Sequence, residues 1–366
     1  MTDTICILVP GLSGGGAEFV AGQWATGLAE SGRDVLVVAT HESAVPARDL
    51  PFEVRTMAST TFPARVRELA GILSATRPAV IVSLMPHWNV LSLLATSVMS
   101  GARPRTIISG RNIESGLSAR MGRSYRAELF LAHRLYRRAD AYVAISHPVA
   151  AEAIASYGLK PERVWVVPNP AAGKVDLDAA RQARQERLNR RDNRGPLRLV
   201  IPGRLVPQKQ PEIPVLVASR LRELGVAVDG IDYFGSGPLQ SKVEHLAREA
   251  GIDVKMHGWV DRWFDHAGPG SVLLLPSYAE GFGNVFVEAG AYGVPSAATS
   301  RALGVADAIA PGLTGHLAPS DSIGDLAEAV AKAAEITVPV ELDGWLRNFS
   351  RSSSLEILER AMFTSR

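Results

Sequence analysis

The sequence is poor in cysteine, in long uncharged stretches and in excess charge of either sign. Cys6 is the only cysteine, so the chain forms no internal disulfide, and its place in the apolar run 5–9 predicts a buried thiol rather than a nucleophile. No run of about 18 uncharged apolar residues is present, so we expect no membrane-spanning helix. The formal net charge of +2 argues against a general nucleic-acid-binding protein.

Signals for secretion and for metal binding are also missing. Met1 to Thr4 carries no basic side chain, and the apolar run that follows has the length of a strand, so we expect no signal peptide and a cytoplasmic protein. Cysteine and histidine show no spacing typical of a zinc site, and no pair of aspartates of the kind that holds Mg2+ between phosphates is seen. We therefore expect neither a metal ion nor a bound cofactor.

The length and the hydrophobic content indicate more than one globular domain. A chain of 366 residues exceeds what one hydrophobic core usually serves, so two domains are expected. In both halves, strand-like apolar runs alternate with helical stretches, for example at 5–9 and 79–83 in the first half and at 197–201 and 271–275 in the second. This alternation predicts α/β domains, each with a parallel sheet covered on both faces.

The most informative segment runs from 276 to 295. A buried strand at 271–275 is followed by a proline and a glycine pair, Gly281 and Gly283, before helical spacing begins near Asn284. The first turn of such a helix has backbone N–H groups without internal partners, and the positive end of the helix dipole points into the loop. The segment therefore favours an anionic ligand such as a diphosphate.

Two glutamates flank this glycine loop. Glu280 precedes the glycines, and Glu288 lies about one turn into the helix. The carboxylates accept hydrogen bonds while the N–H groups bind negative charge, and a sugar nucleotide needs both, because it carries hydroxyls at its two ends and a diphosphate in the middle. An ordinary strand–turn–helix with two solvated glutamates is the alternative interpretation.

Other strand ends carry small, basic or acidic residues that should lie at the carboxyl edges of the two sheets, where ligands bind. In the second half they are Gly203, Arg204 and Lys209 after the run 197–201, and Gly235 and Gly237 after the run 230–234. In the first half they are Gly14, Gly15, Gly16 and Glu18 after the first strand, His87 after the run 79–83, and Arg111, Asn112 and Glu114 after the run 106–109. The alternatives are surface charges for Arg204 and Lys209, a surface turn for Arg111, and a packing or capping role for His87.

These motifs together resemble those of a known enzyme family. The pattern Pro276-Ser-x-x-Glu280-Gly-Phe-Gly-x4-Glu288, followed by Gly293-x-Pro295, resembles the E-x7-E signature of the retaining GT-B glycosyltransferases of family 4, also called group 1. Gly203-Arg204-x4-Lys209 resembles the segment that supplies two cations to the donor diphosphate in that family. The sequence departs from the family at Gln210, where a glycine is usual, and at Leu303 and Asp307, which replace a glycine and a glutamate.

The resemblance implies a fold and an activity. The fold is α/β of the GT-B type, with two Rossmann-like domains, a cleft between them and a C-terminal helix that crosses back to the first domain. The implied boundaries are an acceptor domain at 1–170, a linker at 171–195, a nucleotide-sugar donor domain at 196–345 and the crossover helix at 346–366. The implied reaction is metal-independent transfer of a hexosyl or N-acetylhexosaminyl group, with retention, from a nucleotide-diphosphate sugar, a UDP-sugar above all.

The resemblance also implies roles for single residues. Those expected to take part in catalysis are Glu280, Arg204, Lys209 and Arg111. Those expected to bind the donor are Gly203, Arg204, Lys209, Gly235, Gly237, Glu280, Gly281, Phe282, Gly283, Asn284 and Glu288. Those expected on the acceptor side are Gly14, Gly15, Gly16, Glu18, His87, Arg111, Asn112 and Glu114. We favour front-side attack assisted by the leaving phosphate, and a glycosyl intermediate on a carboxylate stays open as the alternative.

The acceptor is suggested by a basic stretch at 118–138, in which arginines alternate with apolar residues. It is either an ordinary domain helix with a solvated face or a helix that lies on anionic lipid. We expect a peripheral enzyme of surface-glycan assembly on the inner face of the cytoplasmic membrane, with a glycan or lipid-linked acceptor and no nucleic acid partner. The alternatives are a small-molecule acceptor such as a natural product, a sugar-nucleotide epimerase and a non-catalytic sugar-nucleotide-binding module.

Overall fold

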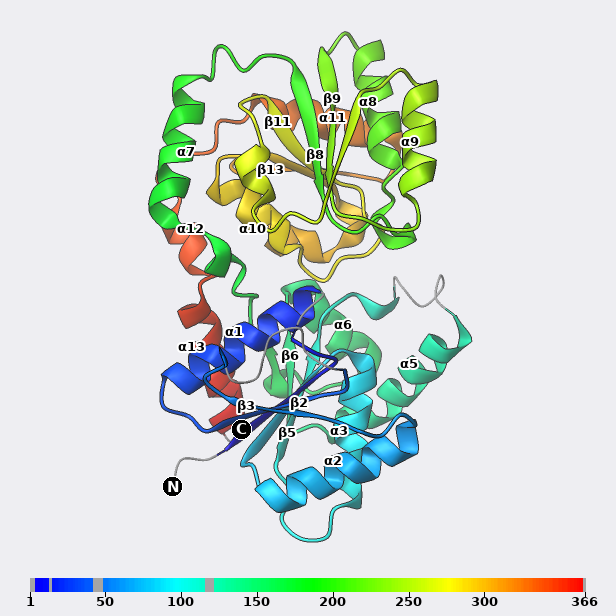
Figure 1. Cartoon of the computed structure of the whole chain (residues 1–366), viewed down its shortest axis with the longest axis vertical. Coiled ribbons are helices and arrows are strands. Elements are labelled where there is room, and N and C mark those ends of the chain that lie inside the picture. Colours follow the sequence, from blue (N-terminus) through cyan, green and yellow to red (C-terminus); the bar gives the residue numbers. More distant parts are fainter. Residues whose placement is uncertain (1–3, 13–14, 42–48, 116–121, 365–366) are drawn as a thin grey trace. The chain divides into compact units, whose positions relative to one another are not determined.

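The computed structural model describes residues 4–12, 15–41, 49–115 and 122–364 (Figure 1). Its internal contacts divide the chain into unit 1, comprising Met1–Gly173 and Asn348–Arg366, and unit 2, Lys174–Arg347. Each unit is built around its own parallel sheet with helices between the strands. The predicted class of two Rossmann-like α/β domains is therefore confirmed.

Unit 1 contains a parallel sheet in the order β3-β2-β1-β4-β5-β6-β7. Its strands are β1 (Ile5–Val9), β2 (Val35–Ala39), β3 (Glu53–Thr56), β4 (Val80–Leu84), β5 (Arg105–Gly110), β6 (Ala141–Ala144) and β7 (Val164–Val166). Every residue of β1, β2 and β4 is buried. This explains why these strands appear in the sequence as continuous apolar runs rather than as alternating patterns.

Helices cover both faces of this sheet. They are α1 (Gly16–Glu30), α2 (Phe62–Thr76), α3 (Pro86–Val98), α5 (Arg123–Leu135), α6 (His147–Tyr157) and α13 (Arg351–Phe363). Successive side chains of β1 enter opposite layers: Ile7 joins the core formed with α1 and α13, whereas Cys6 and Leu8 join the core formed with α2 and α3. Burial raises the pKa of the Cys6 thiol to about 12, so this cysteine is an inert core residue, as expected.

The C-terminal helix α13 belongs to unit 1, and Figure 1 shows it in red beside the blue α1. The indole N–H of Trp24 in α1 donates a 2.9 Å hydrogen bond to the hydroxyl of Ser354 in α13. Nearby, the backbone N–H of Ala172 donates a 3.0 Å bond to the carbonyl of Phe349. The segments that leave and re-enter unit 1 are thus joined to each other, and the predicted return of the C-terminal helix to the first domain is confirmed.

Unit 2 has a parallel sheet in the order β10-β9-β8-β11-β12-β13. Its strands are β8 (Leu197–Pro202), β9 (Val228–Phe234), β10 (Val254–Gly258), β11 (Ser271–Leu275), β12 (Ser296–Thr299) and β13 (Gly315–Ala318). Its helices are α7 (Leu177–Asn189), α8 (Ile213–Glu223), α9 (Gln240–Glu249), α10 (Asn284–Ala291), α11 (Ile323–Glu335) and α12 (Asp343–Arg347). Apolar side chains of α8, α9 and α11 form one core with one face of the sheet.

The segment 171–195, which we expected to be a helix or linker at the domain boundary, contains helix α7 of unit 2. The side chain of Arg184 in this helix is fully buried, and its guanidinium donates to the carbonyls of Ala291 (2.5 Å) and Val340 (2.9 Å). Backbone carbonyls therefore compensate the burial of this charge, which also pairs with Asp343. The charged residues of this segment therefore include a buried, hydrogen-bonded side chain as well as solvent-exposed ones.

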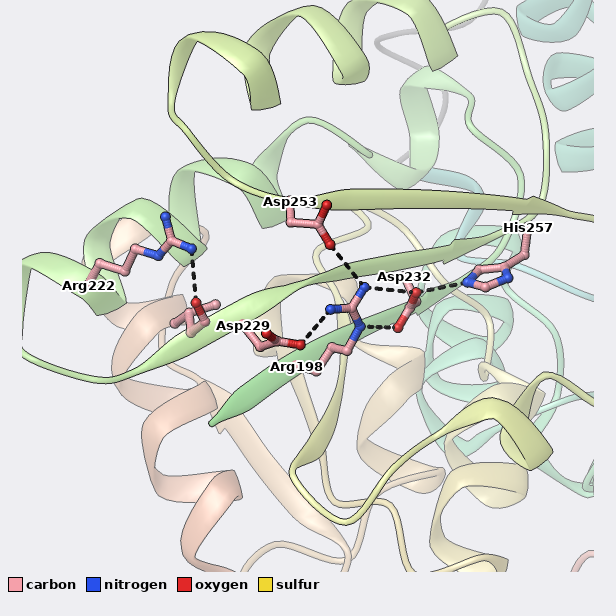
Figure 2. Close-up of polar contacts among 7 residues, drawn as sticks. Arg198, Arg222, Asp229, Asp232, Asp253 and His257 are labelled. Atoms are coloured by element: carbon pink, nitrogen blue, oxygen red, sulfur yellow. Dashed lines mark hydrogen bonds and ion pairs between the residues drawn. The ribbon is translucent and has the colours of Figure 1, made fainter. Parts of the chain in front are cut away.

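A polar network connects three strands of unit 2 on the sheet face opposite the α8–α9–α11 core (Figure 2). Arg198 of β8 pairs with Asp232 of β9, and also with Asp229 at 2.7 Å and Asp253 at 3.4 Å. Nε2 of His257 in β10 lies 2.8 Å from Oδ1 of Asp232. The network fixes the edge strand β10 to the middle of the sheet.

In the part of the chain that the structure describes, no helix combines the length and the apolar character needed to cross a membrane.

Candidate functional site

The glycine loop between β11 and α10 has the strand–loop–helix form that the sequence predicted. Gly283 precedes the helix with φ 94°, in the left-handed region, and a Cβ at this position would lie 2.6 Å from the ring of Phe286. Both facts require glycine here. The side chain of Phe282 is buried, so this residue offers a ligand only its backbone. The N–H groups at the start of α10 are suited to bind an anion.

Lys209 and Glu280, both predicted site residues, form an ion pair. Nζ of Lys209 lies 2.5 Å from Oε1 of Glu280, and the glutamate is buried. The two loops are also joined by the side-chain amide of Gln208, which donates to the carbonyl of Ala279 at 2.8 Å. The structure thus brings a cation and a carboxylate from segments about 70 positions apart to one place in unit 2.

Gln210 occupies the position after Lys209 where the resembled family usually has glycine. Its backbone is left-handed, with φ 46° and ψ 55°. Among the described residues, its buried Oε1 has no hydrogen-bond partner. The glutamine is therefore an unfavourable choice for this turn, but it does not prevent Lys209 from reaching Glu280.

Arg204 and the glycines of the neighbouring loops line the ends of β8 and β9. Arg204 is exposed. The loops pack backbone against backbone, because a Cβ on Gly235 would lie 2.1 Å from the carbonyl oxygen of Gly203. Gly237 follows in the same loop, where the N–H of Leu205 donates to the carbonyl of Ser236. Only glycine at position 235 permits this approach.

Glu288, near the middle of α10, is 8% exposed, and its Oε2 accepts a 2.8 Å hydrogen bond from the indole N–H of Trp263. Burial raises the pKa of Glu288, while the Trp263 hydrogen bond and the charge of Lys174 oppose that rise and Asp261 adds to it. The sequence did not point to Trp263, since a single tryptophan in the short segment between β10 and β11 has no motif of its own.

The loop after β12 approaches Glu280 through its backbone. Leu303, one of the departures from the family pattern, pairs with Glu280 in an isolated bridge and has φ 51° and ψ −61°. A leucine rarely adopts this conformation, which is close to a classic γ-turn. A Cβ on Gly304 would lie 2.3 Å from the carbonyl oxygen of Glu280, so the second glycine of the element is required by packing.

In unit 1, the residues expected on the acceptor side include a glycine pair at the start of α1. Gly15 and Gly16 lie at this helix start, and a Cβ on Gly15 would be 2.6 Å from Oε2 of Glu18. The Glu18 carboxylate therefore folds back over the loop. Gly14 lies outside the described residues.

Arg111 is partly buried in unit 1, and its side chain is held by several contacts that a free surface turn would not have. Its guanidinium donates to Oδ1 of Asn169 and to the hydroxyl of Ser109, and it lies over the ring of Trp24 at 5.4 Å. Burial lowers the pKa of Arg111 to about 9, although Tyr142 and Glu18 oppose the shift. Within the described residues, its buried Nε has no hydrogen-bond partner. Arg111 thus holds the Pro-Asn-Pro segment that ends the first part of unit 1.

Glu114 is also buried. Burial raises its pKa to about 7, although the Tyr125 hydroxyl, which donates to Oε2, opposes the shift. The backbone N–H of Glu114 donates to the carboxylate of Glu152 at 2.9 Å. Asn112 accepts the N–H of Ile113 at 2.9 Å and so shapes the turn. The sequence did not indicate that Tyr125 and Glu152, which lie 11 and 38 positions from Glu114, would contact it.

His87 pairs with an acid on α5. Its Nδ1 lies 3.1 Å from Oε1 of Glu128, and its ring packs edge-on against those of Phe62 and Trp88. These contacts fit the packing interpretation of His87. The pair between His87 and Glu128 connects α3 to α5.

Two family models match this chain and together cover most of it. The model described as "Glycosyl transferases group 1" matches residues 196–335, which lie in unit 2. The model described as "Glycosyltransferase Family 4" matches residues 14–171, which lie in unit 1. Both descriptions agree with the resemblance seen in the motifs.

Among curated proteins, the chain is 32% identical over 232 residues to a D-inositol 3-phosphate glycosyltransferase of Kribbella flavida, a match that covers 57% of this chain and 51% of the relative. It is 35% identical over 210 residues to D-inositol 3-phosphate glycosyltransferase 2 of Catenulispora acidiphila, covering 53% and 47%. The chain thus spans about half the length of these relatives.

Among solved structures, the lipopolysaccharide outer core galactosyltransferase WaaB has a TM-score of 0.74 at 19% identity, over 98% of this chain and 99% of that chain. The Anabaena protein HepE in complex with UDP-glucose has a TM-score of 0.74 at 18% identity, over 98% of both chains. At such identities the likeness concerns the fold, and that fold is GT-B, as predicted.

Proposed function

The chain belongs to the group 1 glycosyltransferases of family 4, and we propose that it transfers a sugar from a UDP-sugar, with retention, to a glycan or lipid-linked acceptor in surface-glycan assembly. One observation carries the proposal above all: the Lys209–Glu280 ion pair, in the same unit as the anion-binding start of α10 and the second carboxylate, Glu288. The complex of the structural neighbour HepE with UDP-glucose supports the choice of donor.

Each donor-side group has a defined task in this proposal. The N–H groups at the start of α10 bind the diphosphate, and the exposed Arg204 adds a positive charge to it. Glu280 accepts hydrogen bonds from sugar hydroxyls, and Glu288 accepts them from the ribose. Before the donor arrives, Lys209 neutralises the buried Glu280 carboxylate. When the donor is bound, the same ammonium group also faces the phosphate that leaves.

In the transfer step, the bond between the anomeric carbon and the β-phosphate oxygen breaks while the acceptor oxygen forms its bond on the same face of the sugar. The acceptor proton passes to the departing phosphate, so no side-chain base is required. Arg204, Lys209 and the loop N–H groups stabilise the negative charge that grows on the phosphate. We propose that the step needs no metal ion, and activity that survives EDTA would support this.

The acceptor part of the proposal rests on helix α5. Phe130 and Leu131 are 59% and 40% exposed on this helix, and Arg126 and Arg134 are exposed beside them. The Arg134 guanidinium lies over the Phe130 ring at 4.7 Å. A helix with exposed apolar and basic side chains is suited to an anionic lipid surface, where each basic residue contributes about 1 kcal/mol. We propose that this face brings the enzyme to lipid-linked acceptors.

Liposome flotation tests the membrane part. Binding should require anionic lipid, weaken with salt and fall when Phe130 and Leu131 are both replaced by serine. Leu216→Ser is the matched control, because Leu216 is an exposed leucine of unit 2 and far from α5 in the chain. If the protein does not bind anionic vesicles at low salt, the membrane part of the proposal is wrong.

A small phosphorylated acceptor is the second candidate. The curated relatives that match the chain are named for D-inositol 3-phosphate, a phosphorylated polyol that is not attached to lipid. Full activity on such an acceptor, together with no binding to vesicles, would favour this candidate over the lipid-linked one.

The donor and the reaction type are tested together by incubating the protein with UDP-, GDP-, ADP- and dTDP-sugars and measuring nucleotide release with and without acceptor. Release that depends on an acceptor identifies a transferase. Release of nucleotide and free sugar without acceptor would indicate the epimerase alternative. Binding without any release would indicate a non-catalytic module, and the absence of binding would contradict the donor assignment.

A further inference from the structure

The two carboxylate oxygens of Glu288 have different surroundings. Oε2 accepts the hydrogen bond from the indole of Trp263, whereas Oε1 has no hydrogen-bond partner among the described residues. An indole N–H is a donor only, so it can pair only with an oxygen that accepts. Oε2 is thereby committed to the protein, and Oε1 remains for a ligand.

The indole is held in place by aromatic packing. Trp263 begins a short 3-10 helix, Trp263–His266, and is 2% exposed. Its ring meets that of Phe264 edge-on, with centroids 5.9 Å apart, and lies 6.3 Å from the ring of Phe234 at the end of β9. Phe264 in turn stacks on Tyr292, which follows α10. The donor atom is therefore fixed relative to the helix that carries Glu288.

We propose that Trp263 is a positioning residue of the donor site: its N–H fixes the Glu288 carboxylate so that Oε1 faces the ribose hydroxyls of the nucleotide. This inference rests on the proposed function, in which Glu288 binds the ribose. Trp263 itself touches no part of the substrate in this proposal and acts only through Glu288.

The charges around Glu288 explain why such a residue is needed. Burial favours the protonated carboxyl and raises the pKa of Glu288. The Trp263 hydrogen bond and the Lys174 ammonium favour the carboxylate, and Asp261, which is ion-paired with Lys174, opposes it. Since Oε2 must accept from the indole, a proton bound to Glu288 would sit on Oε1, where it would alter the contact with the ribose. Trp263 therefore keeps the ligand-facing oxygen an acceptor.

The test compares binding of UDP with binding of its 2'-deoxy form by calorimetry in Trp263→Phe, which keeps an aromatic ring but removes the donor. UDP affinity should fall about 3- to 30-fold, since one hydrogen bond to a charged group is lost. Affinity for the 2'-deoxy form should fall less, so discrimination between the two sugars shrinks. Trp165→Phe, which removes a buried indole from unit 1, is the matched control and should leave both affinities unchanged.

The pH dependence provides a second readout. The pH below which UDP affinity declines should move upward in Trp263→Phe, because nothing replaces the hydrogen bond that opposed protonation. In a Glu288→Gln background, Trp263→Phe should not change the pH below which UDP affinity declines. Ionisation of the UDP diphosphate also affects binding, but it is the same for every variant and therefore does not contribute to the difference between them. A purely structural tryptophan would lower stability without changing either the ribose discrimination or the pH midpoint.

The outcomes distinguish the inference about Trp263 from the proposed function. If the wild-type protein discriminates ribose from deoxyribose and Trp263→Phe does so equally well, the inference about Trp263 is wrong while the proposed function stands. If the wild-type protein binds none of UDP, GDP, ADP or dTDP, the proposed function is wrong and the inference is overturned with it. The ratio of the two affinities does not depend on the folded fraction, so partial unfolding of the variant does not hide the result.

Discussion

The ammonium group of Lys209 lies 2.5 Å from the carboxylate of Glu280, and this pair joins the loop after β8 to the loop after β11. Both groups were expected at the donor, one at the phosphate and the other at the sugar. Their contact means that neither is a free charge before the donor binds. Removing Lys209 leaves the buried Glu280 carboxylate without its counterion, which is more costly than losing an exposed ion pair.

We therefore expect Lys209→Ala to lower both turnover and stability. The loss in kcat should be about 100-fold or more, larger than the rise in KM, because the charge acts mainly in the transition state. The free energy of unfolding should fall by about 1–3 kcal/mol, since Glu280 is left unpaired. Steady-state kinetics and urea denaturation measure the two effects.

Arg204→Ala is the contrasting variant, because Arg204 is exposed. It should lower kcat in the same way while changing the free energy of unfolding by less than about 0.5 kcal/mol. Equal kinetics for wild type and Arg204→Ala would show that Arg204 does not act on the phosphate.

Glu288→Gln should weaken nucleotide binding but raise stability. Affinity for UDP should fall by about 1.5–3 kcal/mol, as for the loss of a charged hydrogen-bond acceptor. Burial raises the pKa of Glu288, so stability associated with its protonated form is present at low pH and is lost as pH rises through the folded pKa. The neutral glutamine avoids that loss, so the variant should gain in Tm over wild type as pH rises from 5 to 8. A Tm difference that is constant over this range would contradict the raised pKa.

Gln210→Gly should stabilise the protein by about 1 kcal/mol. It relieves the left-handed backbone and removes a buried side-chain oxygen that has no partner among the described residues, against the entropy cost of a glycine. Thermal unfolding of the variant and wild type tests this. Leu303→Gly is a parallel case, with φ 51° but no orphaned polar atom, and it should show a smaller gain or none.

Asp232→Asn should destabilise the sheet in a pH-dependent way. Burial acts to raise the pKa of Asp232, but hydrogen bonds from Arg198 and His257 outweigh it and lower the pKa. The stability from these bonds is present above the usual aspartate pKa, about 3.9, and is lost as pH falls through the lower folded value. The variant should be about 1–3 kcal/mol less stable at pH 7, with the gap closing below about pH 4. Asp229→Asn, an exposed partner of the same arginine, should cost about 0–1 kcal/mol.

The sequence predicted the strand, loop and helix around Glu280 because each depends on neighbouring residues: an apolar run, a glycine with positive φ, and a helix start. It did not predict the Trp263–Glu288 hydrogen bond or the Arg111–Asn169 contact, which join residues far apart in the chain. Such pairs are decided by the packing of strands and loops, and one sequence carries no sign of them.

Charge in the sequence was also a poor guide to exposure. The segment 171–195 was expected to be a helix or linker at the domain boundary rather than core, because it is charged and poor in apolar residues, but Arg184 within it is fully buried. Backbone carbonyls at the end of α10 and before α12 accept hydrogen bonds from its guanidinium group. A sequence pattern shows which side chain is charged, but it does not show whether backbone carbonyls will be placed to accept hydrogen bonds from that side chain when it is buried.

The hydrogen bond between Ala172 and Phe349 has a consequence for synthesis of the chain. Because unit 2 lies between Gly173 and Asn348 in the chain, the ribosome completes unit 2 before it makes α13, which belongs to unit 1. The core between α1 and the sheet lacks Leu358, Ala361 and Met362 until α13 has left the ribosomal exit tunnel. During that interval the apolar face of α1 is exposed to the cell, and we expect chaperones that bind nascent chains to recognise this face rather than any surface of unit 2.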